Sequence, residues 1–89
     1  MKTHVLKISP EHFDPVFSGR KTAELRFNDR NYKAGDLLKL REFFDGAFTG
    51  NHAFRRVTHV ADIGEFAEGY VLISMIPASE FEVAAAEAA

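Results

Sequence analysis

The chain has no cysteine and no tryptophan, and no lysine or arginine follows Arg56 in its 89 residues. The lack of cysteine excludes disulfides, thiolate nucleophiles and cysteine-based zinc or iron–sulfur sites, and it is compatible with a reducing cytosol. No run approaches the roughly 20 apolar residues of a membrane span. The first residues lead into a short strand-like segment and lack the apolar core of a secretory signal. We therefore expect a cytoplasmic protein with no membrane partner.

The length leaves room for one small domain. A chain of this size buries only about 60% of the surface that it exposes when unfolded, so it holds one core without a deep internal cavity. Any ligand site is therefore expected to be a cleft on the surface.

The net charge of −2 conceals an asymmetry along the chain. The first 56 residues contain all 11 basic residues and seven acidic ones, a formal charge of +4. The last 33 contain six acidic residues and no lysine or arginine, a formal charge of −6. This asymmetry suggests an anionic partner for the first part. A solvated surface with an acidic tail also explains it, and charge alone favours that plainer interpretation.

Five segments have the alternation or composition of β-strands, at residues 3–8, 22–27, 37–43, 54–61 and 70–76. Residues 70–76 are apolar on both faces, which predicts the central and most buried strand. Between the strands, turn-forming residues predict loops at 28–31, 34–36, 45–51 and 62–69.

Two helical segments are expected. An N-cap residue followed by proline occurs twice, at Ser9 and at Asp14, so we expect a bent helix or two successive turns that end at Gly19. The spacing i, i+3, i+4 predicts its core-facing residues to be Phe13, Val16 and Phe17.

Near the C-terminus, Ser79 and Glu82 fit a capping box that opens an alanine-rich stretch, a marginal helix unless Phe81 and Val83 dock. The pattern as a whole predicts a mainly β, α+β domain with one or two short helices. Its roughly five strands form a small, mostly antiparallel barrel or a strongly twisted sheet.

Side chains that can carry chemistry gather in residues 19–30. Segment 22–27 alternates between an apolar and a polar set, and we expect the polar set to face outward. The predicted ligand-contacting residues are this polar set, its neighbours and an aromatic residue at the start of the last strand: Arg20, Lys21, Thr22, Glu24, Arg26, Asn28, Asp29, Arg30 and Tyr70.

These residue types suit a nucleotide. Lys21 and Arg26 can hold a phosphate or a developing oxyanion, Arg26 through its planar fork and Lys21 as a point charge. Glu24 can accept a hydrogen bond from the amino edge of a base. The plainer interpretation is that Glu24 pairs with Arg26 or Arg30 on a solvated strand, which needs no ligand.

The segment 19–26, GRKTAELR, resembles the G-x-K-x-x-E-x-R signature of ASCH domains, which belong to the PUA-like superfamily of small β-barrels. Further stretches resemble a compact phage and bacterial branch of that family: Asn28-Asp29-Arg30, Gly35-Asp36-Leu37-Leu38, Val57-Thr58-His59-Val60 and Gly69-Tyr70-Val71-Leu72. The resemblance covers residues 3–76. It implies a PUA-like domain at residues 1–77 and an acidic, alanine-rich tail at 78–89, a marginal helix.

The resemblance implies a domain that binds single-stranded or modified RNA, or a nucleotide, in a cleft lined by the signature, without a cofactor. One branch of the family hydrolyses N4-acetylcytidine, and other members have been proposed to cleave single-stranded RNA. In the hydrolase branch Lys21 matches the catalytic lysine, Glu24 stands where that branch has threonine, and Glu65 or Glu68 would supply a later glutamate. Non-catalytic binding is favoured over an amidohydrolase or a ribonuclease, in which Lys21 and Glu24 would be catalytic.

Other features suggest weaker alternatives. The four histidines have no recognised metal-ligand spacing, so we expect no metal and place them at the surface or half-buried. Phenylalanines around residues 43–54 can form a base-stacking platform, and Arg55 and Arg56 can contact phosphate. A third hypothesis is a protein-interaction domain that docks through residues 79–89; nothing identifies that partner.

Overall fold

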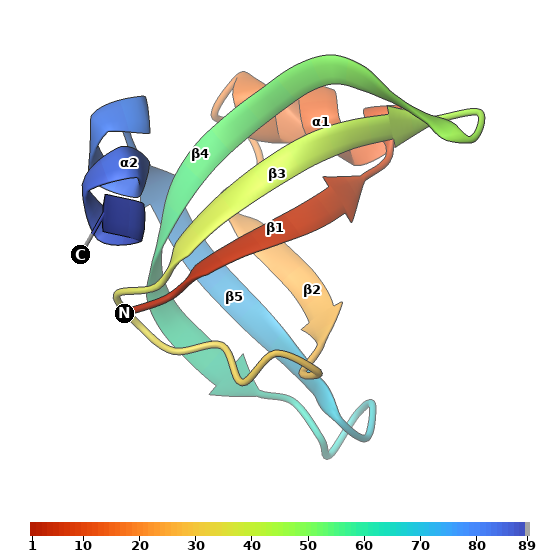
Figure 1. Cartoon of the computed structure of the whole chain (residues 1–89). Coiled ribbons are helices and arrows are strands. Elements are labelled where there is room, and N and C mark those ends of the chain that lie inside the picture. The colour runs from red at the N-terminus through yellow and green to blue at the C-terminus, as the bar shows by residue number, and fades with distance from the viewer. Residues whose placement is uncertain (89) are drawn as a thin grey trace.

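The computed structural model of the chain describes residues 1–88 and contains five strands and two short helices (Figure 1). The strands form one sheet in the order β1-β3-β4-β5-β2. In chain order the elements are β1 (Thr3–Ile8), α1 (Pro10–Phe17), β2 (Ala23–Phe27), β3 (Leu37–Phe44), β4 (Ala47–Asp62), β5 (Tyr70–Pro77) and α2 (Glu80–Ala88). The mainly β fold with five strands and two short helices is therefore confirmed.

The sheet curls into a half-barrel whose open side lies between its two edge strands, β1 and β2 (Figure 1). Only β1 and β3 pair in parallel; the other three pairings are antiparallel. One side chain crosses the open side: Nη2 of Arg26 on β2 donates to the carbonyl oxygen of Lys7 on β1 at 2.8 Å. The two edges therefore meet through a side chain instead of a strand ladder.

The core lies inside the curl, and strand alternation explains which residues reach it. Leu38 and Leu40 point inward from β3, while Lys39 and Arg41 point to the other face. Helix α1 packs on β3. The buried cluster comprises Leu6, Ile8, Phe13, Val16, Tyr32, Leu38, Leu40, Ala53, Val57, Val71, Ile73 and Met75.

Helix α1 is a single helix that contains Pro15, which excludes the alternative of two successive turns. Gly19 follows its end with a φ of 84°, as predicted for a residue that leaves the helix in the left-handed region. Phe13 and Val16 are buried, but Phe17 is 66% exposed and stacks on the Phe13 ring. Phe17 therefore lies at the end of the helix, outside the buried cluster.

The β3–β4 hairpin is longer than predicted because its turn consists of Asp45 and Gly46 alone, both at positive φ. Thr49 and Asn51, expected in the loop, lie in β4. Their side chains donate to the buried Glu42 carboxylate at 2.8 and 3.1 Å. These polar residues therefore satisfy the buried Glu42 carboxylate and do not form a turn.

The centre of the sheet is β4, and β5 lies between β4 and β2, which corrects the prediction of a central last strand. On β5, Val71, Ile73 and Met75 are buried, whereas Leu72 is 39% and Ile76 50% exposed. The apolar residues on its second face remain partly open because the helices pack mainly on β3 and β1.

Helix α2 begins with the predicted capping box. Ser79 Oγ accepts from the Glu82 amide at 3.1 Å, and the Glu82 carboxylate accepts from the Ser79 amide at 2.7 Å. Of the two residues whose docking the helix was expected to need, Val83 is buried and Phe81 is 86% exposed. Glu82 also pairs with Arg56 at 2.8 Å, which holds α2 near the start of β1. Neither described helix has the length and apolar character needed to cross a membrane.

His4 is buried, although the sequence suggested a surface or half-buried position. Its Nε2 lies 2.9 Å from Asp36, whose carboxylate also accepts from the backbone amides of Lys2 and Lys33. Burial raises the pKa of Asp36, but the hydrogen bonds from His4, Lys2 and Lys33 outweigh it and leave that pKa below its ordinary value. This cluster ties the first strand to the turn before β3.

Candidate functional site

Strand β2 presents its polar face to the inside of the curl, the reverse of the prediction. Glu24 is only 5% exposed, whereas Leu25 and Phe27 are each 54% exposed. A buried carboxylate is costly unless charged or polar donors satisfy it. Lys21 and Arg26 supply those donors from the same segment, so Glu24 can face inward while the apolar residues of this edge strand stay partly open.

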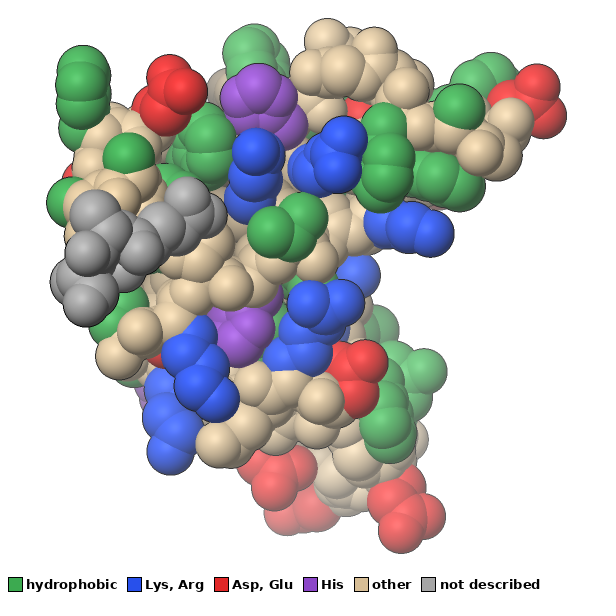
Figure 2. All heavy atoms as spheres, in the orientation of Figure 1, with side chains coloured by type: hydrophobic (Ala, Val, Ile, Leu, Met, Phe, Trp, Pro, Cys, Tyr) green, Lys and Arg blue, Asp and Glu red, His purple; other side chains and the backbone are tan. Residues whose placement is uncertain are grey.

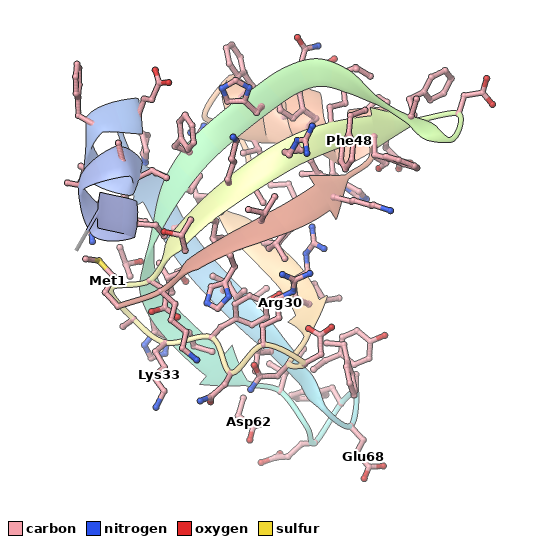
Figure 3. The ribbon with its side chains drawn as sticks, in the orientation of Figure 1. Met1, Arg30, Lys33, Phe48, Asp62 and Glu68 are labelled. Atoms are coloured by element: carbon pink, nitrogen blue, oxygen red, sulfur yellow. The ribbon has the colours of Figure 1, made fainter. Side chains whose placement is uncertain are left out.

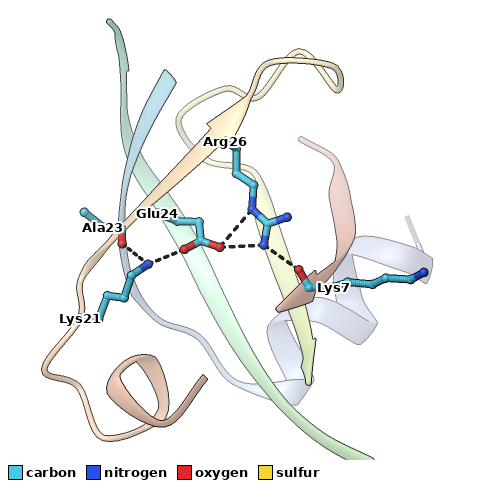
Figure 4. A network of polar contacts seen from close by, with 5 residues as sticks. All are labelled: Lys7, Lys21, Ala23, Glu24 and Arg26. Carbon is cyan, nitrogen blue, oxygen red and sulfur yellow. Dashed lines mark hydrogen bonds and ion pairs between the residues drawn. The ribbon is translucent and has the colours of Figure 1, made fainter. Parts of the chain in front are cut away.

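The three signature side chains form one network (Figure 4). Lys21 Nζ donates to Glu24 Oε1, and also to the Ala23 carbonyl oxygen at 2.6 Å. Arg26 donates to Glu24 Oε2 through Nε at 3.0 Å and Nη2 at 2.7 Å, and Nη2 also reaches Lys7. The predicted pairing of Glu24 with Arg26 is correct, but the carboxylate is buried and not on a solvated strand. Arg30 has no part in it.

The network has a net positive charge and N–H donors that its own hydrogen bonds do not use. Two cations and one carboxylate leave a formal charge of +1. An ammonium has three N–H donors and a guanidinium five, of which Lys21 uses two and Arg26 three in the described structure. One donor on Lys21 and the two on Nη1 of Arg26 therefore remain for a ligand. The side chains of Lys21 and Arg26 are 26% and 24% exposed, so solvent reaches both.

A surface cleft of about 440 Å³ adjoins this network, as the chain length led us to expect. Its walls come from the end of β1, the start of α1 and the edge of β2, where residues of both faces contribute, together with Leu72 of β5. The lining residues are Lys7, Ile8, Ser9, His12, Lys21, Ala23, Glu24, Leu25, Arg26, Phe27 and Leu72.

A second cleft of about 480 Å³ lies next to the first, and the two share Lys7, Arg26 and Phe27. Together they follow the open side of the half-barrel, with the Arg26–Lys7 hydrogen bond between them. The second cleft is lined by Val5, Leu6, Lys7, Arg26, Phe27, Asp29, Arg30, Tyr32 and Phe48.

The structure therefore brings together five of the nine predicted ligand-contacting residues. Lys21 and Glu24 line the first cleft, Arg26 lines both, and Asp29 and Arg30 line the second. In Figure 3, Arg30 lies on the open side below β1.

The other four do not line these clefts. Arg20 donates through Nε to Ser18 Oγ at 3.1 Å, and the exposed Thr22 contributes its carbonyl to the Met75 amide. Asn28 accepts from the Tyr32 amide at 3.1 Å and shapes the turn after β2. Tyr70 packs edge-to-face on Phe27 and lines a different hollow with Asn28 at the far end of β2.

Two further predicted contacts are engaged elsewhere. Arg55 donates to the carbonyls of Phe54 and Val16 at the end of α1, and burial lowers its pKa. Arg56 is held by Glu82 and by the Gly35 carbonyl. Both guanidinium groups are therefore bound to protein acceptors, and neither lines the two clefts.

The later glutamates also lie away from Lys21. The loop that carries Glu65 and Glu68 precedes Tyr70, which pairs with Phe27 at the far end of β2. Four residues of extended strand, about 13 Å, separate that end from the start of β2. Neither glutamate replaces the catalytic one that the resemblance implied.

Sequence reasoning missed several lining residues. Ser9 is the N-cap of α1 and His12 follows three residues later in its first turn, a spacing that indicates a shared side. Lys7 carried no such signal, because only the curl of the sheet brings it to the open side. Phe48 belongs to the phenylalanines that were expected to form a base-stacking platform, but the sequence did not place it beside Arg26. Tyr32 is buried against His4 with ring centroids 4.9 Å apart, and burial, followed by the charge of Asp29, raises its pKa.

Among the described residues, no group of three histidine or acidic side chains lies close enough together to hold a metal ion. The charged groups of the clefts are instead mostly cationic. The arrangement suits an anion with an attached planar or apolar group.

Residues 3–75 match the family described as "Domain of unknown function (DUF3850)", and the chain belongs to that family. It is 44% identical over 75 residues to the "Uncharacterized 12.9 kDa protein in GpA 3′region" of Escherichia phage P2; the match covers 84% of this chain and 69% of the phage protein. The crystal structure of hypothetical protein PH0355 has a similar fold, with a TM-score of 0.59 and 17% identity. That match covers 88% of this chain and 100% of the other.

Proposed function

We propose that this DUF3850 domain binds RNA or a nucleotide in the paired clefts between β1 and β2, and that its GRKTAELR segment acts as an ASCH-type signature. The observation that carries the proposal is the convergence of Lys21, Glu24 and Arg26 on one open cleft. Phosphate is the anionic group common to all nucleotides, and a planar arginine fork beside a lysine suits it.

The charge and donor count of the network supports a phosphate ligand. Glu24 orients the two cations, and their three remaining donors serve the incoming anion. A carboxylate has about four lone-pair positions, of which Glu24 uses three. The remaining position on Oε1 can accept from an amino group such as cytosine N4.

The second cleft suits the base. Phe27 and Phe48 line it and are 54% and 40% exposed, so their rings are accessible to a flat partner. Unpaired bases stack on aromatic and arginine planes in single-stranded RNA recognition. Because Arg26 borders both clefts, a nucleotide can place its phosphate on one side of that residue and its base on the other.

Binding of cytidine 5′-monophosphate and of a fluorescent single-stranded oligoribonucleotide tests the proposal. Lys21→Ala and Arg26→Ala should each weaken both affinities by about 10-fold, and affinity should fall as salt rises. Arg20→Ala is the matched control, because it removes the same charge from the same segment outside both clefts. Equal effects of the three variants, or no binding by the unmodified chain, would sink the assignment.

An amidohydrolase is the second candidate, and the direct hydrogen bond between Lys21 and Glu24 favours it. Such a pair places a proton acceptor beside the amine, the geometry that acid–base catalysis needs. With N4-acetylcytidine, water would add to the carbonyl carbon of the acetyl group. The bond between that carbon and N4 would then break, giving acetate and cytidine. Acetate release above the level of Lys21→Ala would establish turnover. Shortening of the RNA in the binding assay would indicate a ribonuclease instead.

A further inference from the structure

The outer face of β1, β3 and β4 carries a second group of basic and aromatic side chains, which lies outside the two clefts except at Lys7 and Phe48. Strand alternation and register place these residues together: Lys7 pairs with Arg41, Lys39 with Phe54, and Phe43 with Phe48. We call this surface the outer basic face; it consists of Lys7, Lys39, Arg41, Phe43, Phe48, His52 and Phe54. In Figure 2, basic and hydrophobic side chains alternate over this part of the molecule.

Each cation of the outer basic face lies over an aromatic ring. The Arg41 guanidinium carbon is 3.7 Å from the Phe48 ring centroid, Lys7 Nζ is 4.4 Å from that of Phe43, and Lys39 Nζ is 5.8 Å from that of Phe54. In the described residues none of these cations pairs with a carboxylate. Aromatic rings hold them in place without neutralising them.

Among the side chains that the structure describes on these strand segments, none that is acidic offsets this charge on the same face. The strand segments that form it contain one acid, Glu42, which pairs with Ile8 and is buried on the opposite face with Thr49 and Asn51. The acidic helix α2 is anchored elsewhere, through Glu82 to Arg56. The outer basic face is therefore a positive surface with flat stacking groups.

We infer that the outer basic face binds single-stranded nucleic acid that continues from the clefts. The planar guanidinium of Arg41, stacked on Phe48, leaves its second plane for a base, while Lys7 and Lys39 meet neighbouring phosphates. An acidic peptide would use the cations but has no flat groups for Arg41 and Phe54.

Continuity with the clefts supports this path. Lys7 and Phe48 line the second cleft and also belong to the outer basic face. A strand that leaves the cleft at Phe48 therefore meets Arg41 next. The path rests on the proposed function for its starting point, but its stacking residues differ from Lys21, Glu24 and Arg26.

The test compares a short ligand with a long one. A fluorescent oligouridylate of about 12 nucleotides, within the usual site size of a small single-strand-binding domain, should bind at least about 10-fold more tightly than cytidine 5′-monophosphate. Arg41→Ala should weaken the oligonucleotide about 5- to 50-fold by removing a stacking plane, and should leave the mononucleotide affinity unchanged. Lys39→Ala should lower the salt slope by about 1.

Two further variants sharpen the result. Arg41→Lys keeps the charge but removes the plane, so the salt slope should stay while the oligonucleotide affinity falls. Lys33→Ala removes one exposed cation at the far end of the molecule from Phe48 (Figure 3) and should change neither affinity. Equal oligonucleotide affinities for Arg41→Ala and Lys33→Ala would overturn the inference, as would tighter binding of a polyglutamate peptide or of phosphatidylserine vesicles.

The outcomes separate this inference from the proposed function. Oligonucleotide binding that depends on Lys21 and Arg26 but not on Arg41 would leave the clefts as the site and remove the outer path. Binding that depends on Arg41 without any mononucleotide affinity would do the reverse. No binding of either ligand would contradict both.

Discussion

The Glu24 carboxylate accepts two hydrogen bonds from Arg26, at 3.0 Å from Nε and 2.7 Å from Nη2, although the two residues lie only two positions apart on one strand. The same Nη2 donates to the Lys7 carbonyl on the opposite edge of the sheet. Glu24 therefore fixes the plane of the guanidinium that spans the open side. Its burial links the stability of the half-barrel to the geometry of the proposed site.

Replacing Glu24 by glutamine should destabilise the fold by about 2 kcal/mol, because the neutral amide would leave the two cations without a charged acceptor. The value stays moderate because Lys21 and Arg26 are partly exposed and keep some solvation. Urea unfolding at neutral pH measures the change. Glu65→Gln, on an exposed loop, is the matched control. Equal stabilities of the two variants would show that the Glu24 network contributes little.

Gly69→Ala should cost more stability than Gly19→Ala. Both glycines have φ near 80°, a region that costs an L-residue about 1 kcal/mol. A Cβ at Gly19 would meet open space, but one at Gly69 would collide with the Phe27 ring, which packs on Tyr70. The total for Gly69→Ala should reach about 3 kcal/mol, because the ring must move. Thermal unfolding of both variants measures the difference. Equal losses of stability would mean that the positive φ alone causes the loss and that the contact with Phe27 contributes nothing.

The Asp36 cluster predicts a loss of stability in acid. Hydrogen bonds from His4 and two backbone amides hold the folded-state pKa of Asp36 below its ordinary value of 3.8. Between the folded-state pKa and the ordinary value, the unfolded chain binds more protons than the folded chain. The contribution of Asp36 to stability is therefore complete above about pH 4 and is lost as pH falls through the folded-state pKa. Unfolding free energies from pH 6 to pH 2 should fall more steeply for the unmodified chain than for Asp36→Asn. Parallel curves would contradict this.

Much of the fold was accessible to sequence reasoning because it depends on local pattern. Residues 3–8 were expected as a strand and form β1, since β-forming residues fill the segment between turn signals. Ser79 and Glu82 form the predicted capping box because its two hydrogen bonds span only three residues. Gly19 ends α1 for a similarly local reason, its left-handed conformation.

The candidate site was only partly accessible. The sequence identified Lys21, Glu24 and Arg26 as one group, because alternation places Glu24 and Arg26 on one face. It could not reveal Lys7, and it could not show that His12 and Phe48 come next to that group, because these residues belong to other elements and reach the clefts through the curl of the sheet. It also placed Tyr70 in the site. In the structure Tyr70 begins β5 and pairs with Phe27, at the far end of β2.

The amino-acid sequence by itself determined the number and order of the strands and helices and which residues share a face within a strand, because these depend on neighbours within a few positions. It did not determine the length of the β3–β4 hairpin or which strand is central. It did not determine which face of β2 is buried. Alternation assigned the apolar set to the inside, but the tertiary structure turned Glu24 inward, where Lys21 and Arg26 satisfy its charge. A buried carboxylate is stable only with such donors in place, and their arrangement exists only once β2 faces β1 across the open side.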